Sequence, residues 1–443
     1  MPDQRLPISA PHEGASRPYV THEAFRRQWG AILLVALIGL PGIVLRITDP
    51  HIDPLLAAAV HGVSILAAAL LLSWAAETAE LDISQGLALA VIAFIAVLPE
   101  YAVDAVLAWK AGADPAEAEK GLAIANMTGG NRLLIGIGWP VVFLIFFYRR
   151  RLRELVVSRA RSIELTFLAI ATTYVILIPL RGTLTLIDTM VLVTLFVIYM
   201  IFTSRVESEE IELVGPARAM GTLPDFRRRA LVTLVLIYAA GVIIAAAEPF
   251  ADGLVETGEK LNVSEFLLIQ WVAPLASESP EVLVAGLLAW RGRAAAGMGA
   301  LISSKVNQWT LLIGTLPIAF MLSSGDWGLL EGLPLDSRQR EEVFLTAAQS
   351  AFAIAVFVNL KMSRNEAITL FVLFATQLFI TNEAVRLVYA FAYLALCVGL
   401  LTWNRAAIPG LLRDASLVMR GKAAFDEPEA ALASERDRPA AEQ

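Results

Sequence analysis

Two short motifs, Leu98-Pro99-Glu100 and Ser279-Pro280-Glu281, each place a carboxylate beside a proline inside a long hydrophobic stretch, 181 positions apart. Proline has no amide hydrogen, so a helix through each motif bends and leaves the carbonyl of Ile95 or Ala276 without its helical partner. An ionisable side chain at mid-membrane costs on the order of 3 kcal/mol on insertion scales, so it marks a functional site by default. Because exposed carbonyls beside a carboxylate attract cations, the two motifs predict a cation site.

The composition around these motifs is that of a polytopic membrane protein. Hydrophobic residues make up 57% of the chain and charged residues 17%, and the mean hydropathy is +0.64. Apolar runs of roughly 20 residues, the length that spans a bilayer, predict an all-α fold with about twelve transmembrane helices. These runs lie at residues 29–48, 53–74, 84–109, 121–147, 163–180, 184–203, 229–250, 264–290, 295–322, 341–360, 365–381 and 384–403.

Basic residues cluster at alternate span ends, which indicates the cytoplasmic side. When the spans are numbered from a cytoplasmic N-terminus, the clusters that fall inside are Arg26-Arg27, Arg149-Arg150-Arg151, Arg227-Arg228-Arg229, Arg291 with Arg293, Lys361 with Arg364, and Arg405. The first apolar segment has no small-residue cleavage site after it, so we expect it to remain as an anchor helix. The sequence predicts a multi-pass protein of the cell (plasma) membrane with both termini in the cytoplasm.

The two halves of the chain carry further matching landmarks in the same order. Leu107-Ala108-Trp109-Lys110 matches Leu288-Ala289-Trp290-Arg291, and Leu133-Leu134-Ile135-Gly136 matches Leu311-Leu312-Ile313-Gly314. Five predicted spans separate the two Pro-Glu helices, and an odd number of spans turns the second copy upside down. We therefore expect two inverted five-helix repeats that meet near the membrane midplane.

The predicted organisation follows from these repeats and from the composition of the ends. The segments are a disordered cytoplasmic N-terminus at 1–28, an extra transmembrane helix at 29–48, a first inverted repeat at 53–203, a cytoplasmic linker at 204–228, a second inverted repeat with a final helix at 229–403, and a disordered cytoplasmic tail at 404–443. Both ends are rich in Pro, Ala, Glu and Arg without sustained periodicity, which is typical of disorder.

Four segments together carry a resemblance to a known family. The first half reads Ala96-Val97-Leu98-Pro99-Glu100 and then Ala125-Asn126-Met127-Thr128-Gly129-Gly130-Asn131. The second half reads Ser277-Glu278-Ser279-Pro280-Glu281 and then, more loosely, Ser303-Ser304-Lys305-Val306-Asn307-Gln308. This arrangement resembles the calcium/cation antiporter superfamily, which includes sodium/calcium exchangers and proton-coupled calcium exchangers. The resemblance implies inverted repeats whose motif glutamates, here Glu100 and Glu281, ligate the transported metal ion.

The resemblance also implies a set of neighbouring ligands. The cation-binding residues are expected to be Glu100, Glu281, Asn126, Asn131, Ser277, Ser303 and Asn307. Calcium takes six to eight oxygen ligands, which carboxylates, exposed carbonyls and amide oxygens supply. Residues expected to serve proton coupling or to lie just outside the ligands are Asp104, Glu278, Lys305, Gln308 and Thr128.

Several of these residues have an alternative interpretation. We expect Lys305 to pair with one of the two glutamates in the empty state and to be displaced when the cation enters. Asp104 and Glu278 have a structural alternative, a buried ion pair with Lys305 or Arg132. Gly129-Gly130 is expected to permit close helix packing.

Four function classes remain after this reading. The leading one is a secondary active antiporter, not an enzyme, that exchanges Ca²⁺ or a related cation for Na⁺ or H⁺ by alternating access. A Na⁺/H⁺ exchanger on the same scaffold is the second, and a non-transporting ion sensor and an intramembrane enzyme are the others. Against an enzyme, the chain has no His-Glu-x-x-His or Gly-x-Ser-x-Gly motif. We expect inorganic cations and the lipid bilayer as partners, with no nucleic acid, no ATP and no cofactor besides the transported cation and H⁺.

Overall fold

Helices dominate the computed structural model, which describes residues 22–82, 97–204, 213, 215–378, 380 and 382–421. Ten helical segments in this part of the chain are long and apolar enough to cross a membrane. They are Arg26–Thr48, Pro54–Ala79, Pro115–Arg150, Arg159–Arg181, Leu186–Thr203, Asp225–Leu261, Glu265–Trp290, Ala294–Ser324, Ser337–Asn359 and Glu383–Trp403. The predicted helical membrane fold is thus confirmed.

Two of the twelve predicted spans are not among these ten. The predicted span 84–109 lies partly outside the described residues, which resume at Val97, and its described part is helix α4 (Leu98–Ala113). The predicted span 365–381 is α17 (Arg364–Gln377). Its 14 residues extend only about 21 Å, less than the roughly 30 Å of a hydrocarbon core.

The chain divides into two compact units, Met1–Val103 with Glu209–Val263, and Asp104–Ser208 with Ser264–Gln443. We call them the first and the second unit; α4 begins in the first and ends in the second. The other helices of the first unit are α1 (His22–Thr48), α2 (Pro54–Ala79), α11 (Pro216–Gly221) and α12 (Asp225–Leu261).

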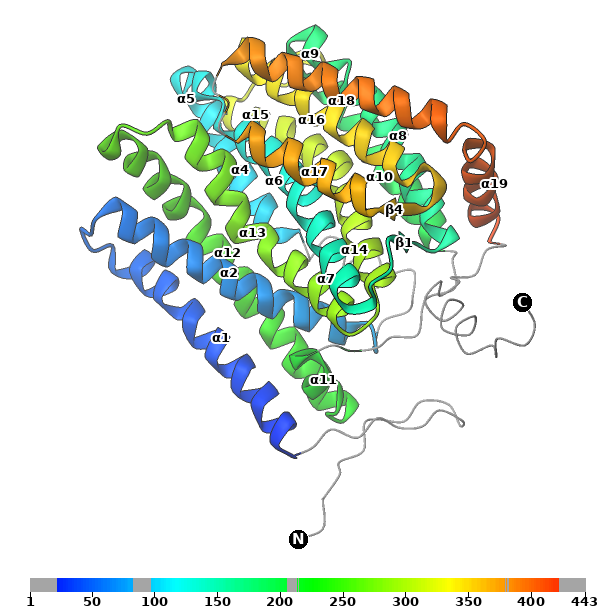
Figure 1. Ribbon diagram of the computed structural model, residues 1–443. Helices are drawn as coiled ribbons and strands as arrows, with labels where there is room; N and C mark the ends of the chain where they lie inside the picture. Colours follow the sequence, from blue (N-terminus) through cyan, green and yellow to red (C-terminus); the bar gives the residue numbers. More distant parts are fainter. Residues whose placement is uncertain are drawn as a thin grey trace. The chain divides into compact units, whose positions relative to one another are not determined.

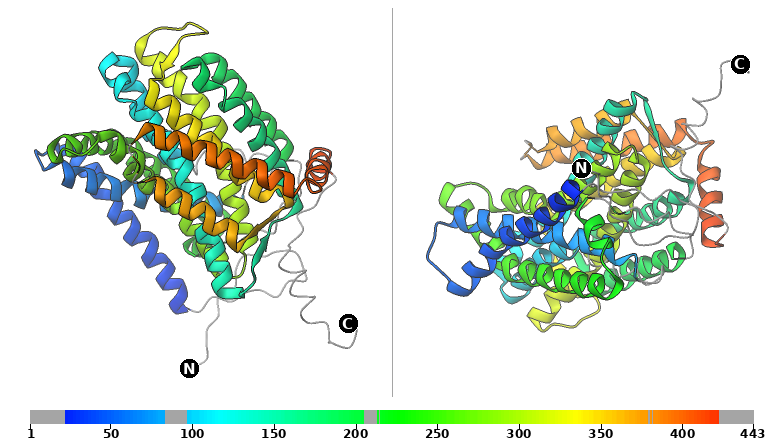
Figure 2. Two further views of the ribbon diagram at one scale, coloured as in Figure 1. Left: turned by 45° about the horizontal axis from the view of Figure 1, so that its top comes forward. Right: turned by 90° about the horizontal axis from the view of Figure 1, so that it is seen from below.

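Helices α1, α2 and α12 of the first unit lie side by side (Figures 1 and 2). Their contact surface combines small and branched apolar side chains, among them Ala68, Leu71, Ala75, Ala239 and Val242. At one end of α2, Asp82 accepts hydrogen bonds of 2.8 and 2.7 Å from the guanidinium of Arg228, and one of 2.9 Å from Arg229. This ion pair ties the end of α2 to the start of α12.

The second unit contains the remaining elements. Before α13 these are α5 (Pro115–Lys120), α6 (Leu122–Leu133), the π-helical segment η1 (Leu134–Gly138), α7 (Trp139–Arg150), β1 (Glu154–Val156), η2 (Arg159–Arg161), α8 (Ser162–Val175), α9 (Ile178–Arg181), β2 (Thr183–Thr185) and α10 (Leu186–Thr203). From α13 onwards they are α13 (Glu265–Trp290), α14 (Ala294–Asn307), the π-helical segment η3 (Gln308–Leu312), α15 (Ile313–Ser324), β3 (Gly332–Pro334), α16 (Ser337–Val356), η4 (Phe357–Asn359), β4 (Lys361–Ser363), α17, α18 (Glu383–Trp403) and α19 (Ile408–Met419).

Two short antiparallel ribbons, which the sequence did not predict, join distant parts of the second unit. Strand β1 pairs with β4, and β2 pairs with β3. Each strand of the first half has a counterpart 178 positions later: β3 follows β1 by this offset, and β4 follows β2. The register obeys the same offset, because Glu154 faces Ser363 in one ribbon while Gly332 faces Thr185 in the other.

The helix caps that follow β2 and β4 repeat at this offset too. The N–H of Thr185 donates to Asp188 Oδ2 over 2.7 Å at the start of α10. The N–H of Ser363 donates to Glu366 Oε2 over 2.7 Å at the start of α17. Both are capping boxes, in which the side chain at the third helical position bonds the backbone of the cap residue.

The ribbons also fix the direction of two central helices. The chain runs from β1 through α8 and α9 to β2, and later from β3 through α16 to β4. Since β1 pairs with β4 and β2 with β3, α8 and α16 run in opposite directions between the same two ribbons.

The predicted disordered ends contain more helix than expected. Within the predicted segment 1–28, α1 already begins at His22, and residues 1–21 lie outside the described part of the chain. Within the predicted tail 404–443, α19 buries Leu411, Ala415 and Val418, a helical spacing of apolar residues, and packs against α8. Residues 422–443 lie outside the described residues.

Candidate cation site

Glu100 and Asp104 lie one turn apart on α4, and both side chains are buried. Asp104 Oδ1 accepts a 2.8 Å hydrogen bond from Nδ2 of Asn126 on α6. One predicted ligand is therefore oriented by a neighbouring carboxylate. The bond uses the amide nitrogen of Asn126 and leaves its Oδ1 as an acceptor. Ile95, the first predicted free carbonyl, lies outside the described residues.

Glu281 lies on α13, a helix that contains two prolines. Pro274 and Pro280 both lie inside α13, and each lacks the amide that would bond the carbonyl four residues earlier, that of Gln270 or Ala276. Glu281 is partly exposed, although its Oε2 atom is buried. Ser304 of α14, which the sequence did not single out, lies beside the Glu281 carboxyl.

Helix α6 packs against α13 through two glycines. A Cβ atom at Gly129 would lie 1.8 Å from the carbonyl oxygen of Gln270, and one at Gly130 would lie 2.8 Å from Glu278 Oε1. The Gln270 carbonyl is the one that Pro274 releases from the helix, so glycine lets α6 approach an exposed backbone oxygen. The expectation that Gly129-Gly130 permits close packing is confirmed.

Lys305 is fully buried on α14 and faces α6. Its Nζ donates to Asn131 Oδ1 at 2.5 Å and to the Asn131 carbonyl at 3.4 Å, and it lies 4.2 Å from the ring centroid of Trp309. Among the described contacts, its hydrogen bonds thus go to Asn131, where the sequence predicted a glutamate partner. Glu278 is the acid that interacts electrostatically with Lys305.

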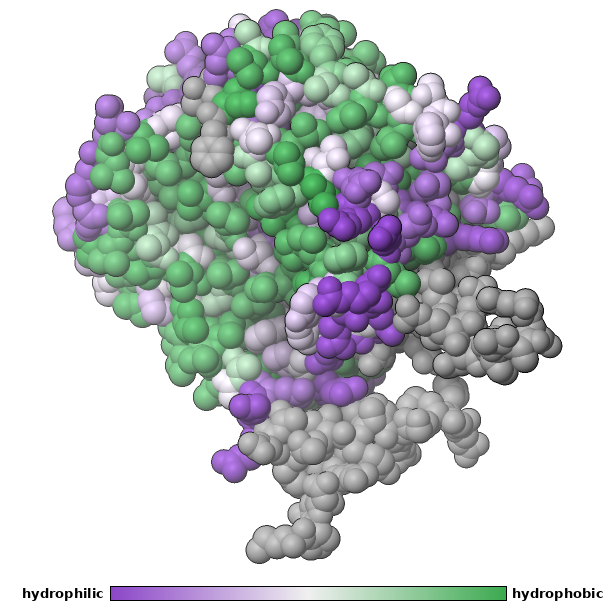
Figure 3. Space-filling view, in the orientation of Figure 1, coloured by the Kyte–Doolittle hydropathy of each residue, from purple (hydrophilic) through white to green (hydrophobic). Residues whose placement is uncertain are grey.

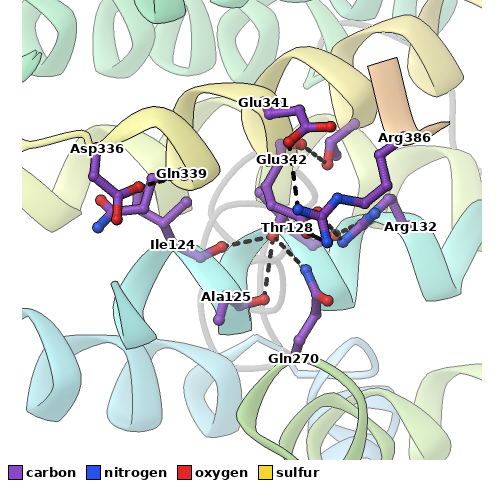
Figure 4. Close-up of polar contacts among 11 residues, drawn as sticks. Ile124, Ala125, Thr128, Arg132, Gln270, Asp336, Gln339, Glu341, Glu342 and Arg386 are labelled. Atoms are coloured by element: carbon purple, nitrogen blue, oxygen red, sulfur yellow. Dashed lines mark hydrogen bonds and ion pairs between the residues drawn. The ribbon is translucent and has the colours of Figure 1, made fainter. Parts of the chain in front are cut away.

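Further polar contacts join α13 to α6 and η3. Gln308 Nε2 donates to Glu278 Oε1 at 2.6 Å. Gln270 Nε2 donates to the hydroxyl of Thr128 at 3.4 Å, and this hydroxyl in turn donates to the Ile124 carbonyl at 2.7 Å (Figure 4). The predicted residues Asn131, Lys305, Glu278 and Gln308 therefore interact with one another across α6, α13, α14 and η3, and Thr128 contacts α13 through Gln270.

The three other predicted ligands of this unit have different surroundings. Ser303 donates to Glu164 Oε1 at 3.2 Å and accepts from Arg161 Nη1 at 3.4 Å, so it belongs to a polar cluster formed by η2 and α8. Ser277 donates to the Pro274 carbonyl at 3.4 Å. Asn307 is buried on α14. Within the described residues, no three His, Cys, Asp or Glu side chains gather in a metal-holding arrangement.

A buried ion-pair cluster that the sequence analysis missed follows directly after Asn131. Arg132 Nη2 lies 2.6 Å from Glu342 Oε2, with side-chain exposures of 2% and 1%. Arg386 of α18 lies 3.6 Å from Glu342 and 3.3 Å from Glu341. Figure 4 shows these side chains converging from α6, α16 and α18. The available signal was a charge inside each of the predicted spans 341–360 and 384–403.

The comparison with known families decides the class of this protein. Residues 52–205 and 231–381 match the sodium/calcium exchanger protein family. The chain belongs to this family. It is a multi-pass membrane protein, and its relatives are cation exchangers rather than enzymes.

Individual relatives agree with this assignment. The chain is similar to the crystal structure of the H⁺/Ca²⁺ exchanger CAX, with 41% identity over 89% of this chain and 99% of that chain, and a TM-score of 0.85. It shares its fold with native YfkE, with 15% identity over 82% and 99% of the two chains and a TM-score of 0.57. CaxA of Alkalimonas amylolytica, described as an antiporter, is 22% identical over 105 residues, which cover 24% of this chain and 33% of that relative.

Proposed function

We propose that this exchanger-family protein is a secondary active antiporter that moves Ca²⁺ across the membrane in exchange for H⁺. The observation that carries the proposal is the likeness to the H⁺/Ca²⁺ exchanger CAX, which extends over nearly the whole of that chain. The acidic residues of the candidate site fit this exchange, since carboxylates both ligate Ca²⁺ and bind protons.

In this proposal the two motif glutamates and the exposed oxygens around them hold the ion. Glu100 and Glu281 supply carboxylates, and Asn126 supplies its Oδ1, because its amide nitrogen is used by Asp104. Carbonyls released by proline, such as that of Gln270, add neutral oxygens. A Ca²⁺ ion needs six to eight such ligands at 2.3–2.6 Å.

Alternating access of two inverted repeats is the proposed transport mode. Two observations support a two-fold relation with its axis in the membrane plane. Strands β1 and β2 recur as β3 and β4 at one offset, while β1 pairs with β4 and β2 with β3. In addition, α8 and α16 run in opposite directions. The same proposal includes the remaining predictions on topology. These are a plasma-membrane location, cytoplasmic termini and the predicted spans 84–109 and 365–381.

A Na⁺/H⁺ exchanger is the second candidate, and the position of Lys305 favours it. The Lys305 ammonium donates a hydrogen bond to Asn131 Oδ1. This neutral oxygen is therefore not available as a ligand for a bound cation. A monovalent cation needs fewer oxygens and less negative charge than Ca²⁺, so the loss harms it less.

Transport in proteoliposomes tests both candidates. We expect Ca²⁺ uptake that depends on an imposed pH gradient and persists without Na⁺, and that is lost in Glu100→Gln and Glu281→Gln. Glu154→Gln is the matched control, because Glu154 is exposed on β1, and its uptake should equal that of the wild type. Proton-coupled Na⁺ flux without Ca²⁺ flux would favour the second candidate. No gradient-driven flux of either cation would contradict both.

A further inference from the structure

A cavity of about 440 Å³ opens where α7 ends and the α13–α14 turn begins. It is lined by Tyr148, Arg149, Arg150, Arg151, Arg291 and Gly292. A volume of this size is in the range of small-ligand sites. Hydrophilic side chains gather over the lower end of α7 beside a broad hydrophobic surface (Figure 3). Four guanidinium groups therefore line one small cavity at the end of two membrane-spanning segments.

Two aromatic rings hold the outer arginines in place. The guanidinium of Arg149 lies 5.1 Å from the ring centroid of Trp290, and that of Arg151 lies 5.3 Å from the ring of Tyr148. The two rings stack on each other, with centroids 6.5 Å apart and planes inclined by 15°. A cation over a ring face keeps its in-plane N–H donors free to bind an anion, so these two ring contacts pre-organise two donors.

The backbone of the turn makes room for a third arginine. Gly292 has φ +93°, a conformation that favours glycine. A Cβ atom at this position would lie 3.0 Å from a terminal nitrogen of Arg150. A side chain there would be strained and would crowd the Arg150 guanidinium, so glycine serves both the turn and the cavity.

Within the described part of the chain, none of the four arginines that line the cavity, Arg149, Arg150, Arg151 and Arg291, forms an ion pair with a carboxylate. Their positive charges are therefore not neutralised by acidic side chains in this part of the chain. Like charges this close repel each other unless an anion lies between them. Arginine binds phosphate oxygens in a bidentate manner. The cavity therefore has the charge and the donor geometry of a phosphate site.

We propose that this cavity binds the phosphate group of an anionic phospholipid. Tyr148 and Trp290 stand at the ends of the segments Pro115–Arg150 and Glu265–Trp290, and aromatic residues at such ends lie at headgroup level. Basic pockets between membrane helices at this level bind anionic headgroups. The stacked rings and the adjoining hydrophobic surface accommodate the glycerol and upper acyl chain, which a free phosphate ion lacks.

Lipid binding to the purified full-length chain in an uncharged detergent tests the proposal. Native mass spectrometry would compare phosphatidylglycerol with phosphatidylcholine for the wild type, for Arg149→Lys/Arg151→Lys, and for Arg26→Lys/Arg27→Lys. The first double variant keeps every charge but loses the stacked, bidentate guanidiniums. The control pair Arg26 and Arg27 likewise consists of two exposed arginines at a span end.

We expect the wild type to prefer phosphatidylglycerol, and Arg149→Lys/Arg151→Lys to weaken its binding by about tenfold, while the control changes it less than about twofold. Equal binding of the two lipids by the wild type, or equal effects of the two double variants, would overturn the proposal. Displacement of phosphatidylglycerol by millimolar inorganic phosphate would overturn the lipid assignment in favour of a soluble anion. If the double variant is not recovered folded, Arg291→Lys carries the same comparison.

Discussion

Replacing Glu342 with glutamine removes one of the two carboxylates that neutralise Arg132 and Arg386 inside the second unit. Glu342 lies 2.6 Å from Arg132 and 3.6 Å from Arg386, and Arg386 also pairs with Glu341 at 3.3 Å. The cluster holds two guanidiniums and two carboxylates, so its net charge is zero. After Glu342→Gln the same buried volume carries one uncompensated positive charge.

The size of the effect follows from the burial of the pair. The Arg132 and Glu342 side chains are 2% and 1% exposed, and removal of one partner from a buried pair costs about 3–5 kcal/mol. Lys361 and Glu154 on the β1·β4 ribbon form an exposed pair at 3.4 Å, with side-chain exposures of 47% and 57%. Such a pair contributes about 0–1 kcal/mol, so Glu154→Gln is the matched control.

Reversible unfolding in detergent, titrated with SDS, measures both variants under one condition. Glu342→Gln should lower the free energy of unfolding by about 3–5 kcal/mol, and Glu154→Gln by less than about 1 kcal/mol. The double variant Arg132→Met/Glu342→Leu removes both charges and should recover most of the loss, because apolar replacement of a buried pair is often neutral. A Glu342→Gln variant as stable as the control, or a double variant less stable than Glu342→Gln, would refute the electrostatic reasoning.

Two further predictions use the same unfolding assay. Gly129→Ala places a Cβ 1.8 Å from the Gln270 carbonyl oxygen and should lower the free energy of unfolding by about 1–3 kcal/mol. Gly241→Ala is the control, because nothing lies within 4 Å of its Cβ, and it should stabilise α12 by about 0.5–1 kcal/mol. Equal effects of the two variants would contradict the packing argument. Hydrogen bonds from Arg228 lower the pKa of Asp82 in the folded protein. The Asp82 carboxylate therefore makes its full contribution to the free energy of unfolding above the pKa of the unfolded state, near 3.8. This contribution is lost as the pH falls through the lower pKa of the folded state. The stability difference between wild type and Asp82→Asn should therefore shrink between pH 5 and pH 3, and a difference that is constant over this range would contradict it.

The sequence predicted the parts of the site that depend on backbone chemistry. The effect of a proline before a glutamate can be predicted from the sequence alone, because the carbonyl that loses its hydrogen bond lies four residues earlier in the same helix. The role of the Gly129-Gly130 pair could also be predicted from the sequence, since glycine has no side chain and lets another helix approach closely. Both features are properties of a single segment. The close approach at Gly129-Gly130 is confirmed, and Pro280 lies inside α13, while Ile95 lies outside the described residues.

Side-chain pairing across the second unit was harder to predict. Lys305 was expected to pair with a glutamate. Its hydrogen bonds go to Asn131, while Glu278 interacts with it electrostatically. An ion pair of Arg132 with Asp104 or Glu278 was one alternative interpretation, and the carboxylate that pairs with Arg132 is Glu342, 210 positions later. The choice among several buried acids depends on which faces of α6, α14 and α16 meet, and charge alone does not encode this. The spacing of charges within a span predicts that a partner exists, but not which one.

The proposed internal repeat rests on one offset that appears in both the sequence and the structure. The landmark Leu133-Leu134-Ile135-Gly136 and its match at Leu311-Leu312-Ile313-Gly314 are 178 positions apart, the offset that also relates β1 to β3 and β2 to β4. The proposed two-fold relation would exchange the strands of the two ribbons and preserve their register, and the observed register is compatible with this. The three-residue strands are too short and too polar to be predicted from local propensity. Under the proposed repeat they become predictable, because a strand at one position implies a counterpart 178 positions away.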